Sequence, residues 1–186
     1  MKLEPLFEVK NNELFTVSGA KVELNLVPVT DIKAPQNFDK NNIYNIIISR
    51  KTVETEPECY NEEYLAQLRD FLKKLEEDGI FAVLTVVPGD DESGISVKQN
   101  GASDVEVESY IACIKHTARR VKDCVSVAGI YIDSDFAAVD AVNKVMLLEN
   151  ELLKKHAQYV FAASAALRGA LGGLSDEYMQ KIVFEA

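Results

Sequence analysis

A short polar cluster follows one of the most apolar stretches of the chain. Asp133, Ser134 and Asp135 come directly after GIYI (129–132), and a helical pattern begins immediately behind them. Carboxyl groups in such a position can transfer protons or, with other oxygen atoms, hold Mg²⁺ or Ca²⁺. Asp and Ser are also preferred at helix N-termini, where their oxygens accept backbone N–H groups. The residues alone leave three interpretations open, namely a ligand or catalytic site, a cation site, and a helix cap.

Acidic residues from a second loop would join this cluster if the strands before them are parallel. Asp90 and Asp91 follow the apolar stretch 80–87. The carboxyl ends of parallel strands share one edge of a sheet, which is where α/β folds bind ligands. We therefore predict a ligand-binding group in which these two residues join Asp133 and Ser134, and we assign it no metal and no other cofactor.

Five apolar runs are predicted to be the strands that position these residues. They are rich in Val, Ile, Tyr and Phe, and the later runs lack polar alternation, as strands buried on both faces do. The runs are KVELNLV (21–27), IYNIIIS (43–49), IFAVLTVV (80–87), VSVAGIYI (125–132) and YVFAAS (159–164). Helical patterns lie between most of them, which predicts a parallel sheet with right-handed crossovers.

Helices are predicted by apolar stripes and by their start and stop signals. They span 62–77, 104–122, 136–155 and 176–185. The first has Asn61 as N-cap and Gly79 as stop. A hairpin is predicted upstream, over about 6–18, with its turn at Asn11 and Asn12.

Five parallel strands are too few to close a barrel, which takes eight. Right-handed crossovers between strands in sequence order place every helix on one face and leave the other face bare. The chain must therefore reverse its strand order, cover the bare face with its N-terminal hairpin, or bury that face against a second copy. We predict a single α/β domain over 1–186 with an incomplete, TIM-barrel-like parallel sheet. A doubly wound open sheet is the alternative, and a homo-oligomer is the expected assembly.

The composition argues against several kinds of partner and compartment. The 20 Lys and Arg residues and 30 Asp and Glu residues give a net charge of -10, which would repel nucleic acid and anionic membranes. No run approaches the ~20 apolar residues of a membrane span. Glu4, Pro5 and Glu8 interrupt the stretch that an export signal would need. An odd number of widely spaced cysteines argues against a disulfide framework, and we predict a cytoplasmic protein.

The two histidines are not expected to be metal ligands. His116 and His156 lie beside Lys or Arg in helical patterns, and neither has a zinc-ligand partner at a suitable spacing. We expect both side chains on solvated helix faces.

The order of these elements resembles the first half of the cellulase-type (β/α)8 glycoside hydrolases, glycoside hydrolase family 5 and its relatives. The likeness spans roughly residues 14–165. ELFTVSGAKVELN is similar to the opening hairpin and first strand of that family, NNIYNIII to its second strand, and TARRVKDCVSVAGIYIDSD to the helix and strand that form its fourth unit. The resemblance implies a barrel-type fold and a small-molecule ligand of carbohydrate type.

The residues that carry chemistry in that family are altered here. The family's second-strand Asn is Asn45, but the Arg expected three positions later is Ile48, and Arg50 is the nearest substitute. The Asn-Glu pair of the fourth strand, whose Glu is the acid/base, is Ser134-Asp135, and the seventh strand with the nucleophile has no counterpart. The resemblance thus implies a non-catalytic protein for ligand binding or assembly. For a hydrolase, it implies Asp135 as proton donor, with Arg50 and Asn45 as contacts.

A second resemblance concerns the last third of the chain. YIDSDFAAVDAV followed by YVFAASAALRGALGGLSD is similar to the sulfate-transporter and anti-sigma-antagonist regulatory domain. In that family the Ser of an Asp-Ser pair is phosphorylated. The corresponding residue here is Ser134. Phosphorylation would add roughly −1.5 to −2 charges. A phospho-switch domain is therefore a further alternative.

Overall fold

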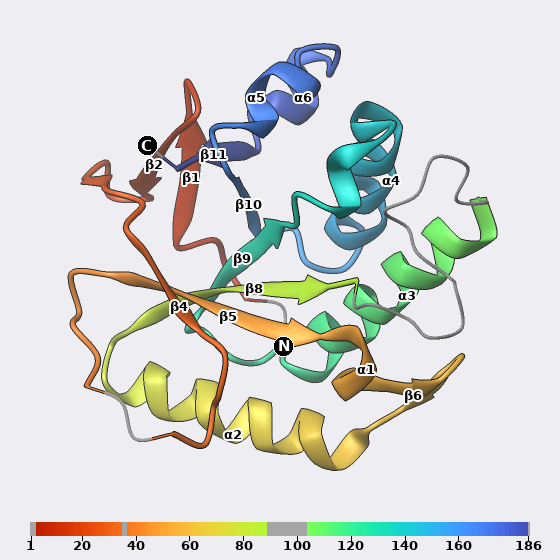
Figure 1. Cartoon of the computed structure of the whole chain (residues 1–186). Coiled ribbons are helices and arrows are strands. Elements are labelled where there is room, and N and C mark those ends of the chain that lie inside the picture. Colours follow the sequence, from red (N-terminus) through yellow and green to blue (C-terminus); the bar gives the residue numbers. More distant parts are fainter. Residues whose placement is uncertain (1–2, 35–36, 89–103, 186) are drawn as a thin grey trace.

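The computed structural model describes residues 3–34, 37–88 and 104–185 (Figure 1). Its centre is a sheet of six strands that are all parallel. The strands are β4 (Leu26–Val29), β5 (Ile43–Ser49), β8 (Phe81–Val87), β9 (Val127–Ile132), β10 (Val160–Ala163) and β11 (Ile182–Phe184). They lie side by side in sequence order, so the sheet is an incomplete barrel and the doubly wound alternative is wrong.

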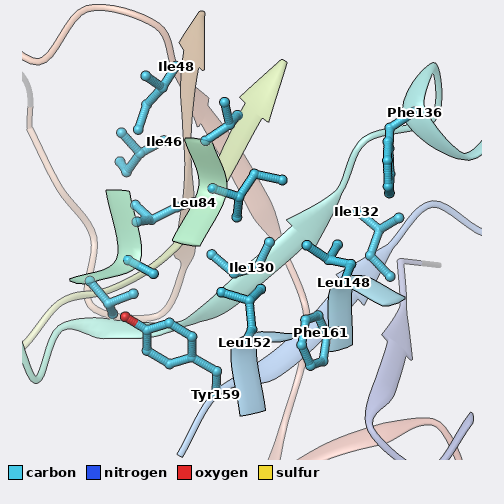
Figure 2. Close-up of a cluster of buried hydrophobic side chains, with 14 of the residues drawn as sticks. Ile46, Ile48, Leu84, Ile130, Ile132, Phe136, Leu148, Leu152, Tyr159 and Phe161 are labelled. Carbon is cyan, nitrogen blue, oxygen red and sulfur yellow. The ribbon is translucent and has the colours of Figure 1, made fainter. Parts of the chain in front are cut away.

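The main helices cover one face of this sheet, which we call the outer face (Figure 1). They are α2 (Glu62–Glu77), α3 (Asp104–Arg120) and α4 (Ala141–Leu153), with short turns at α1 (Arg50–Val53), η1 (Phe136–Ala138), α5 (Leu167–Ala170) and α6 (Asp176–Met179). Figure 2 shows Ile46, Leu84 and Ile130 from three strands in one cluster with Leu148 and Leu152 of α4. None of the helices in the described part of the chain has the length and apolarity to span a membrane.

An N-terminal hairpin packs against the opposite, inner face. Its strands are β1 (Phe7–Lys10) and β2 (Glu13–Thr16), extended by β3 (Lys21–Val22). The predicted turn is confirmed, since Asn11 and Asn12 have φ values of 53° and 62°, the left-handed conformation that a two-residue hairpin turn needs. Phe7 meets Phe81 edge to face at 4.9 Å. The hairpin therefore covers the amino-terminal half of the inner face, where strand residues are buried with it.

A second, smaller hairpin follows β5. Its strands β6 (Glu54–Glu56) and β7 (Cys59–Tyr60) connect α1 to α2. The helix α2 has the predicted bounds, and Asn61 caps it by accepting the N–H of Tyr64 at 3.0 Å. Here the local sequence signals and the structure agree completely.

Three sequence predictions are corrected. The run 21–27 is divided between β3 and β4. The predicted helix 136–155 is interrupted at Asp140, which has a φ of 54°. The predicted helix 176–185 contains only the four-residue α6, and then becomes the sixth strand, because Ile182, Val183 and Phe184 are all buried in the sheet.

The two histidines are less exposed than predicted. His156 is 5% exposed and stacks on Tyr159, with ring centroids 4.9 Å apart. Burial lowers the pKa of His156. The His116 side chain is 14% exposed, stacks on Tyr60 and lies 2.9 Å from a Glu62 oxygen. Both rings therefore stack on a tyrosine, and of the two only His116 remains partly exposed.

The hairpin turn also protects the open edge of the sheet. The backbone of Lys181 bonds to Phe161 and that of Glu185 to Ala163, so the intervening Ile182 directs its carbonyl away from β10. The Asn12 side-chain amide donates to this carbonyl at 3.0 Å and to that of Met179 at 2.9 Å. Unpaired strand edges favour association with other strands, and Asn12 occupies part of this one.

Replacing Asn12 by Gly should therefore destabilise the fold more than replacing Asn11 by Gly. Glycine readily adopts the left-handed backbone conformation at either position. Only Asn12→Gly removes the two side-chain hydrogen bonds to the carbonyls of Met179 and Ile182. We expect a loss of about 1 to 2 kcal/mol in the free energy of unfolding, measured by urea titration. Equal stability of the two variants would contradict a bonding role for Asn12.

A buried carboxyl group on α4 should make the fold sensitive to alkaline pH. Glu149 is fully buried, and neither carboxyl oxygen has a hydrogen-bond partner in the described part of the chain. Burial raises the pKa of Glu149 to about 8, against a smaller opposing effect of Lys181. The folded state thus retains a proton that the unfolded state releases, and stability should fall as pH rises from about 4.5 towards 8.

Glu149→Gln should flatten this dependence and raise the free energy of unfolding at pH 8 by more than about 1 kcal/mol. Denaturant titrations at a series of pH values test it. Glu177→Gln, an exposed carboxyl on α6, is the control and should keep the wild-type slope. A wild-type slope in the Glu149 variant would show that this carboxyl is already ionised.

Candidate functional site

The inner face of the sheet is polar and half-open beyond the hairpin. Strand side chains alternate between faces, and the core cluster under the helices takes the even-numbered residues of β5, β8 and β11. Several inner positions near the carboxyl ends carry polar groups, with the apolar Ile47 and Val87 between them, and we call these polar residues the upper inner face. They are Asn45, Thr85, Tyr131, Asp133, Ser164 and Glu185. All of these except Asn45 and Thr85 are partly exposed, whereas inner residues below them are buried.

Tyr131 and Glu185 link two strands that are not neighbours. The Tyr131 hydroxyl on β9 donates to a carboxylate oxygen of Glu185, just after β11, at 2.6 Å. Between them lies β10, where the residue paired with Tyr131 is Ala162. A methyl side chain leaves room for the phenol ring to cross. Burial, followed by the bond to Glu185, raises the pKa of Tyr131, so the phenol remains a donor at neutral pH.

Asn45 and Thr85 form a second pair on the neighbouring strands β5 and β8. The Thr85 hydroxyl donates to the Asn45 amide oxygen at 2.5 Å, and the residues are 3% and 8% exposed respectively. A distance of 2.5 Å is typical of O–H···O rather than N–H···O hydrogen bonds, which indicates that the Asn45 atom in contact with Thr85 is the oxygen. The amide nitrogen of Asn45 therefore faces away from Thr85. That nitrogen has no hydrogen-bond partner in the described part of the chain. The pair thus holds an unused donor on the inner face.

Asp133 caps the turn that follows β9. One of its carboxylate oxygens accepts the N–H groups of Asp135 and Phe136, both at 3.0 Å. Asp133 thus stabilises the turn before η1, but the N-cap residue of η1 is Asp135, whose side chain makes no capping hydrogen bond. Ser134 lies 3.5 Å from Ser164, hydroxyl to hydroxyl, and both Ser134 and Asp135 are exposed. The role of Asp135 as a proton donor stays a prediction.

Arg50 is positioned differently from the other predicted contacts. Its guanidinium donates to Glu54 at 2.6 Å and to Ser109 of α3 at 2.8 Å, beside a groove of about 560 Å³ between α1, β6 and α3. The structure thus engages Arg50 in the outer layer, away from Asn45. Asp90 and Asp91 lie outside the described residues. Within those residues, no three His, Cys, Asp or Glu side chains are placed to hold a metal ion.

Four residues of the upper inner face were missed by sequence reasoning. Strand alternation could have indicated Thr85 and Tyr131, which share the parity of inner-facing neighbours. Ser164 follows the same rule at the end of β10. Glu185 could not be found, because its segment was assigned to a helix.

Comparisons with known proteins give a fold but no family. No protein-family model matches the sequence, and no curated protein matches it. Solved structures do resemble it. Endo-glycoceramidase II from Rhodococcus sp. is 14% identical with a TM-score of 0.64, over 98% of this chain and 58% of its own. The mannanase catalytic domain from Streptomyces sp. SirexAA-E is 9% identical with a TM-score of 0.65, over 99% and 62%.

An endoglucanase from Pseudomonas stutzeri is also similar, at 11% identity and a TM-score of 0.59, over 77% of this chain and 47% of its own. The chain thus spans about three fifths of the length of the first of these structures. Identities this low describe the fold alone. The resemblance found in the sequence is confirmed at that level, and the chain has the fold of a partial (β/α)8 barrel of the kind found in glycoside hydrolases of family 5 type.

Proposed function

We propose that the chain binds a carbohydrate on its upper inner face and does not cleave it. Barrel-type folds bind ligands at the carboxyl ends of their strands, and there this chain presents a half-exposed aromatic ring, Tyr131, beside the carboxylate of Glu185. One of the similar structures binds sugar-like ligands, since the Rhodococcus endo-glycoceramidase II was solved as cellobiose-like imidazole and isofagomine complexes and as a lactosyl-enzyme intermediate.

The Asn45 amide carries this proposal. A side chain that is more than nine-tenths buried normally satisfies its hydrogen bonds with protein groups or with ordered water. Asn45 uses its oxygen for Thr85 and keeps its two N–H donors without a protein partner in the described residues. A ligand hydroxyl is a suitable acceptor for them, and the Tyr131 ring can pack against the apolar face of a sugar.

Binding is favoured over hydrolysis by the state of the carboxyl groups. A retaining glycosidase needs two carboxyl groups about 5 to 5.5 Å apart, one of which is enclosed enough to hold a proton. Here one Asp133 oxygen accepts two backbone N–H groups of the turn, Glu185 accepts the Tyr131 hydroxyl, and Asp135 is exposed to water. Hydrolysis with Asp135 as proton donor is the alternative function.

Self-association is a separate part of the proposal. The hairpin covers only the lower inner face, and Leu6 and Val17, which flank its strands, are 37% and 57% exposed. A second copy would shield these apolar side chains. Light scattering of the purified chain measures this directly, and a monomeric mass would remove this part of the proposal alone.

Removing the donor or the ring should weaken sugar binding. We expect Asn45→Ala and Tyr131→Ala each to lower the affinity for β-linked gluco- or manno-oligosaccharides by about tenfold, as the loss of one hydrogen bond or one packed ring implies. Calorimetric titration is the measurement. Asn25→Ala, an exposed asparagine before β4, is the control. Unchanged affinity in both site variants would place the ligand elsewhere.

The hydrolase alternative makes an opposite prediction for product formation. We expect no release of reducing sugar from the same oligosaccharides during long incubation, because within residues 3–34, 37–88 and 104–185 no enclosed acid of the upper inner face lies opposite a second carboxylate. Chromatography of the products is the measurement. Turnover that disappears in Asp135→Asn, while binding persists, would establish hydrolysis instead.

A further inference from the structure

We infer that two copies of the chain associate through the open end of the hairpin, with Leu6 and Val17 of each copy seated in a hollow of the other. This inference rests on the self-association proposed above and assigns that contact to particular residues. The surface lies at the amino-terminal ends of β9, β10 and β11, whereas the upper inner face lies at the carboxyl ends. Both copies can therefore keep their upper inner faces open.

Leu6 and Val17 form an apolar pair on the surface of the hairpin. Leu6 precedes β1 and Val17 follows β2, and the Val17 N–H donates to the Leu6 carbonyl at 3.1 Å, which holds the two residues side by side. They are 37% and 57% exposed. Removing apolar surface from water is favourable in proportion to its area, so the pair favours a contact that covers it.

Two hollows adjoin this apolar pair. The smaller one, of about 180 Å³, is lined by Leu6 and by the beginning of β9. The larger one, of about 410 Å³, lies between the hairpin, which contributes Val9 and Val17, and the residues that lead into β10 and β11. In a two-fold contact the same surface serves both copies. An exposed pair beside a hollow suits such a contact, because the pair of each copy can enter the larger hollow of the other.

The larger hollow also carries opposite charges on its two sides. Glu8 comes from the hairpin and Lys181 from the segment before β11. Within the described residues, Lys181 forms no ion pair, and Glu8 pairs with Lys10 in an exposed contact of a kind that contributes little to stability. When the hairpin side of one copy meets the sheet side of the other, Glu8 of each copy can pair with Lys181 of the other. The surface is thus complementary to itself in charge.

Sedimentation equilibrium of the full chain over a range of concentrations measures this association. We expect a dimer whose dissociation constant increases about tenfold or more in Val17→Glu, because each copy then brings a carboxylate into the apolar contact. Val105→Glu is the matched control, since Val105 is 73% exposed and lies on α3, outside both hollows. The control should keep the wild-type dissociation constant within about twofold.

Charge reversal identifies the paired residues. Glu8→Lys and Lys181→Glu each place like charges across the contact and should weaken the dimer about tenfold. The double variant restores opposite charges, and we expect it to regain most of the wild-type affinity. Lys51→Glu, which reverses an exposed cation of α1, is the control for net charge. Circular dichroism and the urea midpoint of each variant verify that it is folded.

The outcomes separate this contact from the proposals on which it rests. A dimer of unchanged affinity in Val17→Glu, or a double charge variant no tighter than the single ones, would overturn the contact and leave self-association in place. A wild-type chain that remains monomeric at every concentration would overturn the contact and self-association together. Carbohydrate binding is measured separately by calorimetry, and its loss or presence is independent of these results.

Discussion

Six parallel strands in sequence order impose one constraint from which most of this structure follows. Right-handed crossovers place α2, α3 and α4 on the outer face, and the inner face receives no helix. The hairpin β1–β2 covers the lower half of this bare inner face by burying Phe7 and Leu14 against the strands. Each fully buried side chain of this kind contributes about 2 kcal/mol. Strands of four residues reach no further, so the upper half of the inner face remains open.

The open half is polar because the same alternation continues to the ends of the strands. Inner positions change from Val83 and Val183 under the hairpin to Thr85 and Glu185 above it. Hydrogen bonds between strands then fix these side chains, through Thr85 to Asn45 and through Tyr131 to Glu185. A surface organised in this way offers oriented donors and acceptors without requiring a closed barrel.

The likeness to glycosidases shows how loosely a barrel-type fold depends on particular residues. Identities of 9 to 14% accompany TM-scores above 0.6 for two of these structures, because the fold depends on the period of burial and on crossover handedness. Chemistry depends on single residues. Asn45 and Asp135 remain predicted counterparts of the family's second-strand Asn and its acid/base residue, and the structure shows Asn45 buried and Asp135 in an exposed turn.

Local signals in the sequence determined the elements whose residues act on their own neighbours. The N-cap of α2, the turn at Asn11 and Asn12 and the parallel strands β5 and β8 were all predicted, because capping, positive φ and unbroken apolar runs are short-range properties. Tertiary structure decided what depends on distant segments. The run 182–184 is a strand only because β10 supplies its hydrogen bonds, and this decision brings Glu185 to Tyr131. The same dependence explains why Arg50, which follows β5 directly, meets Ser109 of α3 in the outer layer.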